Sequence, residues 1–337
     1  MKSRVDRFAK LCLPDFVYAS GDTRGLFFKQ ASIADEVYDD PDIPDAVSMV
    51  LEDPKEGAAP YLFTRWARGQ LLSHLGTREK WFSSVSFRQQ AEELNERRHT
   101  FVGHMFRTMR VVDQDGVRLV RGLVSSKYGD IPDTEIMKSL TDLLPGGWAV
   151  RRASGKTDRA FYAYVLTRDP IEIPGSYFKI HPGVVVKNSE VGYTSLWVYP
   201  MAYIPHMDAV SVFEADVKLR RIHRGSNEAL AEDLKTALKE VSTVWGGVED
   251  RLSRLRTVVF ADEEEAIERM KRVLIGAGST KLFALRCEQA YKAGKHALHN
   301  GLTVYEAVLE RVYRETNRDD AYTKAALAGA LLYKLAP

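Results

Sequence analysis

The sequence predicts an α+β protein with a helical N-terminal part, a central, mostly antiparallel β-sheet and an all-helical C-terminal part. Apolar residues recur at helical spacing before residue 100 and again after residue 225, whereas the stretch between them alternates with a period of two. An Asp115-Gly116 pair in that stretch is typical of a tight hairpin. These observations divide the chain into regions 1–100, 101–225 and 226–337.

Composition indicates a folded protein that is not secreted. With 337 residues, of which 45% are hydrophobic, the chain can bury a core of about two domains. Its start lacks the apolar run of a signal peptide, and no stretch has 18 apolar residues in a row. Cys12 and Cys287 are the two cysteines, too few for a disulfide framework. We therefore expect a protein of the host cell cytoplasm that does not contact a membrane.

Charge is unevenly distributed along the chain, because an acidic loop at residues 33–57 concentrates negative charge. It contains nine acidic residues and one lysine, although the whole protein has a net charge of +2. The remaining chain is therefore basic, which suits a polyanionic partner. The acidic loop itself is either a solvated loop or a flap that competes for the basic surface.

The elements can be placed in order along the chain. In the N-terminal part, Tyr61–Leu75 and Phe82–Leu94 have helical spacing, and the first hundred residues are expected to be mainly helix and loop. A hairpin at 104–126 follows, with arms His104–Val112 and Val117–Ser125. Asp133–Leu144 is predicted to be a short helix. Further strands are expected at Trp148–Arg152, Phe161–Thr167, Val184–Lys187, Thr194–Tyr199 and Val210–Leu219.

The C-terminal part shows helices with well-marked ends. Leu230, Leu234, Leu238 and Val241 form one apolar stripe, and Gly276 is expected to end the next helix. Farther on, Thr303 and Glu306 match a capping box, followed by a buried row of Val304, Val308 and Val312. A last helix is expected from about Asp320 to Lys334.

Catalytic motifs are weak in this sequence. The stretch 153–158, ASGKTD, lacks the first glycine of a phosphate-binding loop and precedes a strand instead of a helix. No GxSxG pattern is present. His206 and His223 lie near acidic residues, but their spacing does not require a metal. We expect no catalytic residue, metal or cofactor.

Basic and aromatic residues are better ordered. Arginines neutralise phosphates and exposed rings stack on bases, as in proteins that bind single strands without sequence preference. A salt-bridged, solvated sheet face would have the same composition. The candidate nucleic-acid-binding residues are Arg107, Arg118, Arg121, Lys127, Tyr128, Lys187, Asn188, Ser189, Arg220, Arg221, His223 and Arg224.

Four blocks in order resemble a phage- and plasmid-like protein family catalogued as a domain of unknown function, number nine-three-two. They are GLVSSKYGDIPDTEIM, VVVKNSEVGYTSLWVYPMAYIP, RRIHRG and NGLTVYEAVLERV with AALAGALL. The resemblance covers about 61–332 and aligns family motifs with Ser125 and Tyr128, with Asn188 and Ser189, and with His223. The chain departs from the family's cysteine-asparagine-glycine step, where it has IPHMDAV. The resemblance implies a mobile-element context and no established activity.

Together these features predict a non-enzymatic nucleic-acid-binding protein of phage or plasmid DNA metabolism. We expect it to hold single-stranded DNA on a basic, tyrosine-bearing sheet, in the manner of annealing and recombination proteins. Two alternatives stay open. One is a nucleotide- or metal-dependent phosphoryl-transfer enzyme with a site around Asn188, Ser189, His206 and His223. The other is a host-interaction or anti-defence protein. DNA or RNA preference, a host protein partner and a homo-oligomer also stay open.

Overall fold

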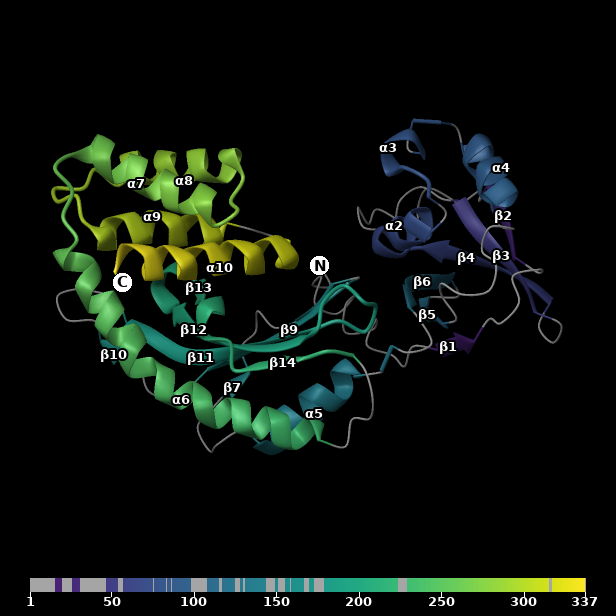
Figure 1. Cartoon of the computed structure of the whole chain (residues 1–337), viewed down its shortest axis with the longest axis horizontal. Coiled ribbons are helices and arrows are strands. Elements are labelled where there is room, and N and C mark those ends of the chain that lie inside the picture. Colours follow the sequence, from purple (N-terminus) through teal and green to yellow (C-terminus); the bar gives the residue numbers. More distant parts are fainter. Residues whose placement is uncertain are drawn as a thin grey trace.

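The computed structural model contains two β-sheets, each with its own helices (Figure 1). It describes residues 16–19, 26–30, 47–53, 57–74, 76–82, 84–85, 87–97, 108–114, 117–124, 128–129, 131–143, 149–150, 155–157, 159–166, 170–172, 179–223, 229–314 and 317–336. The α+β prediction is confirmed, including the central antiparallel sheet and the helical C-terminal region.

The first sheet belongs to the N-terminal third of the chain and has the strand order β1-β5-β6-β4-β3-β2. Its strands are β1 (Phe16–Ala19), β2 (Leu26–Gln30), β3 (Val47–Asp53), β4 (Gly57–Phe63), β5 (Thr108–Gln114) and β6 (Val117–Val124). The accompanying helices are α2 (Arg65–His74), α3 (Glu79–Phe82) and α4 (Phe87–Arg97). The β5–β6 pair confirms the predicted hairpin, while its turn lies outside the described residues.

The sequence analysis missed strands β1 to β4. Residues 1–100 were expected to be helix and loop, with an acidic loop at 33–57, but β3 lies in the second half of that acidic segment and pairs with β4. Residues 33–46 and 54–56 of that segment lie outside the described residues. Because β4 also pairs in parallel with β6, the predicted hairpin completes the first sheet and does not belong to the central one.

The second sheet forms the centre of the molecule and is antiparallel throughout. Its main path runs β13-β12-β11-β9-β7, with β10 beside β11, β14 beside β12 and β8 beside β9. The strands are β7 (Ala149–Val150), β8 (Gly155–Lys156), β9 (Phe161–Leu166), β10 (Ile171–Glu172), β11 (Lys179–Asn188), β12 (Leu196–Ile204), β13 (Ala209–Val212) and β14 (Leu219–Arg221). Short 3-10 turns, η2 (Pro205–Met207) and η3 (Glu214–Asp216), flank β13.

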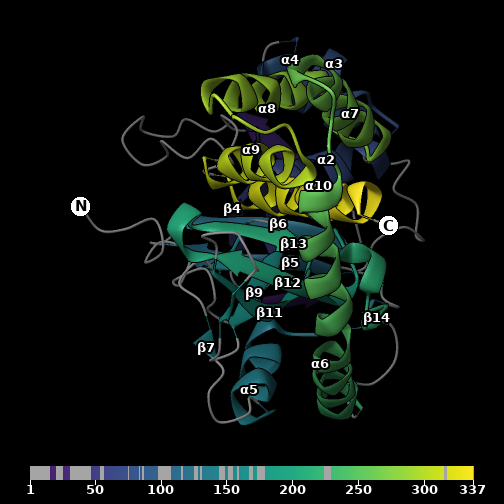
Figure 2. The same cartoon turned by 90° about the vertical axis from the view of Figure 1, so that its left-hand side faces the viewer.

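Helices cover both faces of the second sheet. Helices α9 and α10 lie against one face, and α6 lies against the other together with α5 (Figure 2). Their bounds are α5 (Asp133–Leu143), α6 (Leu230–Arg254), α7 (Glu263–Gly276), α8 (Lys281–Ala293), α9 (Gly301–Tyr313) and α10 (Arg318–Leu335), with the turn η4 (Leu255–Thr257) after α6. Val184, Val185 and Val186 of β11 are fully buried, which is expected of a strand covered on both faces.

The predicted apolar stripes of the C-terminal helices are confirmed. The residues of the α6 stripe and the α9 valine row are all buried. The predicted capping box is wrong, because Asn300 is the N-cap of α9 and exchanges hydrogen bonds with Thr303. Glu306 is therefore not part of the cap. It lines a cavity that is described below. Among the described helices, none is long and apolar enough to cross a membrane.

Gly329 sets how closely α10 approaches the second sheet. A Cβ atom at this position would lie 1.9 Å from the carbonyl oxygen of Val212 in β13. We expect Gly329→Ala to lower the free energy of unfolding by about 1–3 kcal/mol, because helix and strand must separate. Gly246 in α6 has no atom within 4 Å of such a Cβ, so Gly246→Ala is the control and should stabilise the helix by about 0.5–1 kcal/mol. Urea denaturation measures both, and equal effects would contradict the close contact.

Candidate functional site

The loop between β11 and β12, residues 189–195, lies at the end of the second sheet that faces the first sheet (Figure 1). The Ser189 hydroxyl oxygen accepts hydrogen bonds from the backbone N–H groups of Val191, at 3.2 Å, and Tyr193, at 3.0 Å. Gly192 between them has φ +76°, a conformation that favours glycine. The loop is therefore held in one shape by its own serine.

Two side chains of α2 fasten this loop to the first sheet. The indole N–H of Trp66 and the amide of Gln70 both donate to the carbonyl oxygen of Val191, each at 3.0 Å. Gly122 of β6 faces the same residue, and a Cβ atom there would lie 2.5 Å from the Cβ of Val191. The loop can reach β6 only because position 122 has no side chain.

A buried ion pair strengthens the same junction. Arg121 of β6 donates to Glu190 Oε2 at 3.1 Å, and both side chains are at least nine-tenths buried. The second oxygen of Glu190 accepts a hydrogen bond from the backbone N–H of Asp133 at 2.9 Å, at the first residue of α5. A carboxylate is favoured at a helix N-terminus. Glu190 thus ties β6 and α5 to the second sheet.

Asn188 and Tyr128 complete the contacts around the loop. The Asn188 amide donates to the carbonyl oxygen of Ile131 at 2.9 Å and to Asp133 Oδ1 at 2.7 Å. The Tyr128 hydroxyl donates to the Ser189 carbonyl at 2.5 Å and accepts from the Gly192 N–H at 3.2 Å.

The ring of Tyr128 is stacked on His223, with centroids 4.6 Å apart and planes 7° from parallel. His223 is 5% exposed, and its carbonyl oxygen accepts a hydrogen bond from the Gly129 N–H. One face of the tyrosine ring is therefore already covered.

The structure separates the predicted binding residues into four groups. Arg121, Asn188, Ser189 and His223 are buried and hydrogen-bonded within the junction, where the part-buried Tyr128 also contacts the loop. Arg221 is ion-paired with Asp233 of α6. Arg107, Lys127 and Arg224 lie outside the described residues, as does the side chain of Arg118. Lys187 and Arg220 remain as cations on the second sheet.

Lys187 and Arg220 belong to a row of side chains that crosses four strands. Strand register places Arg220 of β14 opposite Trp197 of β12, Trp197 opposite Lys187 of β11, and Lys187 opposite Tyr162 of β9. Directly opposed residues project from the same face of a sheet. The Arg220 guanidinium lies 4.7 Å from the centre of the Trp197 ring. We call these four residues the cation–aromatic row.

Lys187 is the most unusual member of this row. Its ammonium lies 4.1 Å from the centre of the Tyr322 ring and 5.7 Å from that of Tyr193. Within the described part of the chain, neither Lys187 nor Arg220 forms an ion pair. Burial lowers the pKa of Lys187, although the carboxylates of Glu214 and Asp319 act in the opposite direction.

The carboxylates beside the row are already engaged. Asp319 accepts hydrogen bonds from Tyr162, at 2.6 Å, and from Arg159, at 2.7 Å. Glu214 accepts one from Tyr322 at 2.7 Å. Burial is the main cause that raises the pKa of Tyr162 and of Tyr322, so both hydroxyls stay protonated and donate. These contacts attach the start of α10 to the second sheet.

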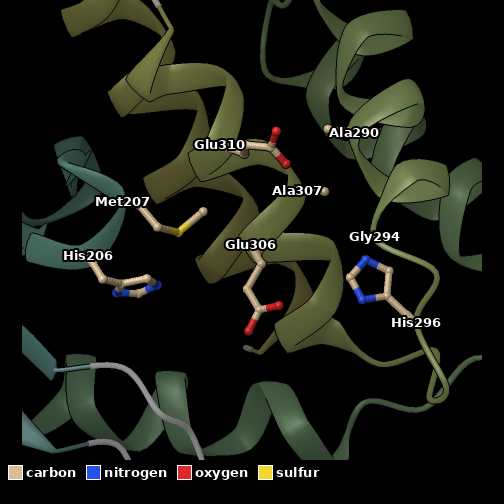
Figure 3. A pocket seen from close by; sticks show the side chains of 8 residues that line it. All are labelled: His206, Met207, Ala290, Gly294, His296, Glu306, Ala307 and Glu310. Atoms are coloured by element: carbon tan, nitrogen blue, oxygen red, sulfur yellow. The ribbon is translucent and has the colours of Figure 1, made fainter.

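A separate cavity of 220 Å³ lies between η2 and α9. His206 and Met207 form one side, His296 forms the other, and Glu306 projects between them (Figure 3). Burial raises the pKa of Glu306 to about 7 and lowers that of His206 and His296. Among the described residues, no group of three or more histidine, cysteine, aspartate or glutamate side chains could hold a metal ion.

This cavity does not assemble the residues of the enzyme hypothesis. His206 lines it, whereas Asn188 and Ser189 lie at the junction between the sheets, near His223. The four residues therefore do not converge on one concave site. Their arrangement gives no support to the hypothesis of a phosphoryl-transfer enzyme with its site at these positions.

Comparisons with protein-family models, with characterised proteins and with solved structures found no match for this chain. The resemblance to the phage- and plasmid-like family stays a prediction.

Removing the charge of Glu190 should destabilise the protein strongly. We expect Glu190→Gln to lower the free energy of unfolding by about 3–5 kcal/mol, because the buried Arg121 loses the negative charge of Glu190. Glu172→Gln, which breaks the exposed pair with Lys179, is the matched control and should leave the stability nearly unchanged. Chemical denaturation gives both values. Similar losses for the two variants would show that the buried pair is dispensable.

Because its pKa is raised, Glu306 should make the free energy of unfolding depend on pH. Between the ordinary value of 4.5 and about 7, the folded protein binds more protons than the unfolded chain, so its stability falls as pH rises. Glu306→Gln removes this penalty, and its stability relative to the native protein should rise by about 1–2 kcal/mol from pH 5 to pH 8. Glu310→Gln, one turn along α9, is the control. Parallel stability curves for Glu306→Gln and native protein would refute the prediction.

Proposed function

We propose that this protein binds single-stranded nucleic acid through the cation–aromatic row. The observation that carries the proposal is that two cations, which form no ion pair within the described part of the chain, flank one partly exposed tryptophan. Proteins that hold single strands combine cations that track the backbone with rings on which bases stack. Lys187 and Arg220 have the first role, and Trp197 has the second.

The neighbouring residues support this assignment. Tyr193 is partly exposed, and its ring lies between Lys187 and Arg159, whose guanidinium is 5.0 Å from the ring centre. Trp197 and Tyr193 are therefore the partly exposed rings beside these cations, because Tyr162 and Tyr164 are buried. This differs from the original expectation, in which Tyr128 was the stacking residue. One face of the Trp197 ring is stacked on Tyr199, with centroids 5.4 Å apart. A site of this size contacts few phosphates, so we expect moderate affinity.

Binding should depend on salt and on Lys187. We expect Lys187→Gln to reduce the slope of log affinity against log salt by about 0.7, the value for one phosphate contact on a single strand. Trp197→Leu should weaken binding by about 1–3 kcal/mol at every salt concentration. Fluorescence anisotropy with labelled oligothymidylate and oligouridylate measures both effects and compares DNA with RNA.

Lys179→Gln is the matched control. Lys179 lies in the same strand as Lys187, but it is exposed and pairs with Glu172 at the strand's other end. Its replacement should leave the salt slope unchanged. If Lys187→Gln and Lys179→Gln behave alike, or if no oligonucleotide binds at about 50 mM salt, the proposal fails.

A further inference from the structure

A second concave feature lies at the junction between the two sheets. It is a cleft of 660 Å³, within the range of about 300–1,000 Å³ that is usual for small-molecule sites. Helix α2, the end of β6 and the loop after β11 form its walls. Its lining residues are Trp66, Gly69, Gln70, Ser73, His74, Leu123, Val124, Tyr128 and Gly192.

The chemistry of the cleft fits a neutral, planar molecule with polar edges. Among the lining residues that the structure describes, none carries a carboxylate, ammonium or guanidinium group. Burial lowers the pKa of His74, which favours the neutral form of its imidazole. Trp66 and Tyr128 contribute aromatic rings, and Ser73 and His74 contribute groups that donate or accept hydrogen bonds. The Gln70 amide is already held by Val191 and by the Leu123 N–H.

The cleft also adjoins the cation–aromatic row. The ring of Trp66 meets that of Tyr193 edge to face, with centroids 5.1 Å apart. Tyr193 in turn lies beside Lys187. A strand that follows the row from Arg220 to Lys187 and Tyr193 therefore arrives at Trp66, where charged groups give way to neutral ones. Phosphates suit the row, whereas an uncharged base suits the cleft.

We propose that the cleft receives one unstacked base of the bound strand. This inference rests on the proposed function and adds to it a site that recognises a nucleobase. Bases that are turned out of a single strand are commonly held between aromatic side chains and hydrogen-bonded along their edges.

Abasic scanning tests the cleft directly. A series of short labelled oligothymidylates, each with one abasic position, is titrated against the full-length protein. We expect one position to weaken binding about 5- to 150-fold, which corresponds to the loss of one stacked base, while the others have smaller effects. Ser73 is exposed on α2, so Ser73→Trp should fill the cleft without disturbing the core. It should weaken binding of the intact oligonucleotide to the level of the critical abasic one.

Thr243→Trp is the matched control, because it adds the same ring at an exposed position of α6 that does not line the cleft, and it should keep the native affinity and the position-dependent pattern. If abasic substitutions weaken binding evenly and Ser73→Trp binds like the native protein, the base site is refuted while binding on the row stands. If no oligonucleotide binds at about 50 mM salt, the proposed function and the base site both fail.

Discussion

The buried pair of Arg121 and Glu190 is the interaction on which the rest of the structure depends. Two charges removed from water are costly unless each is paired and further hydrogen-bonded. Glu190 meets this condition by accepting from Arg121 on one oxygen and from the first turn of α5 on the other. The loop after β11 must therefore hold its shape, which Ser189 and Gly192 provide. The first sheet, α5 and the second sheet meet at this one residue.

Most of the second sheet and its helices could be predicted from local pattern. The apolar stripes of α6 and α9 and the strand alternation around Trp197 reflect burial on a defined face, which periodicity reports well. Strands β1 to β4 were not predicted from the sequence. They depend on pairing partners that are distant in the chain, as β4 depends on β6. A strand whose pairing is supplied by tertiary contacts leaves a weak local signal. The Thr303 capping box failed because Asn300, three residues earlier, is the better cap.

The candidate site was only partly predictable. The sequence singles out the polar stretch KNSEVG, residues 187–192, as a candidate binding site, but spacing does not distinguish a polar residue that binds a ligand from one that satisfies a buried partner. Asn188 and Ser189 are of the second kind. The row of Lys187, Trp197 and Arg220 appears only once strand register is known. Asp319, which accepts a hydrogen bond from Arg159, lies near the C-terminal end of the chain. No sequence pattern around Arg159 indicates this partner.

The loop after β11 serves both the stability and the proposed binding. Its Tyr193 belongs to the proposed binding site, and its Val191 carbonyl oxygen is hydrogen-bonded to α2.

The central claim is that this loop joins the two sheets into one cooperative unit. Native-state hydrogen exchange across a denaturant series tests it most directly, with the amides of Leu123, Val191 and Tyr193 as reporters. We predict that all three open with the same free energy and the same denaturant dependence. Loop amides that exchange at a much lower free energy than Leu123 would contradict the account.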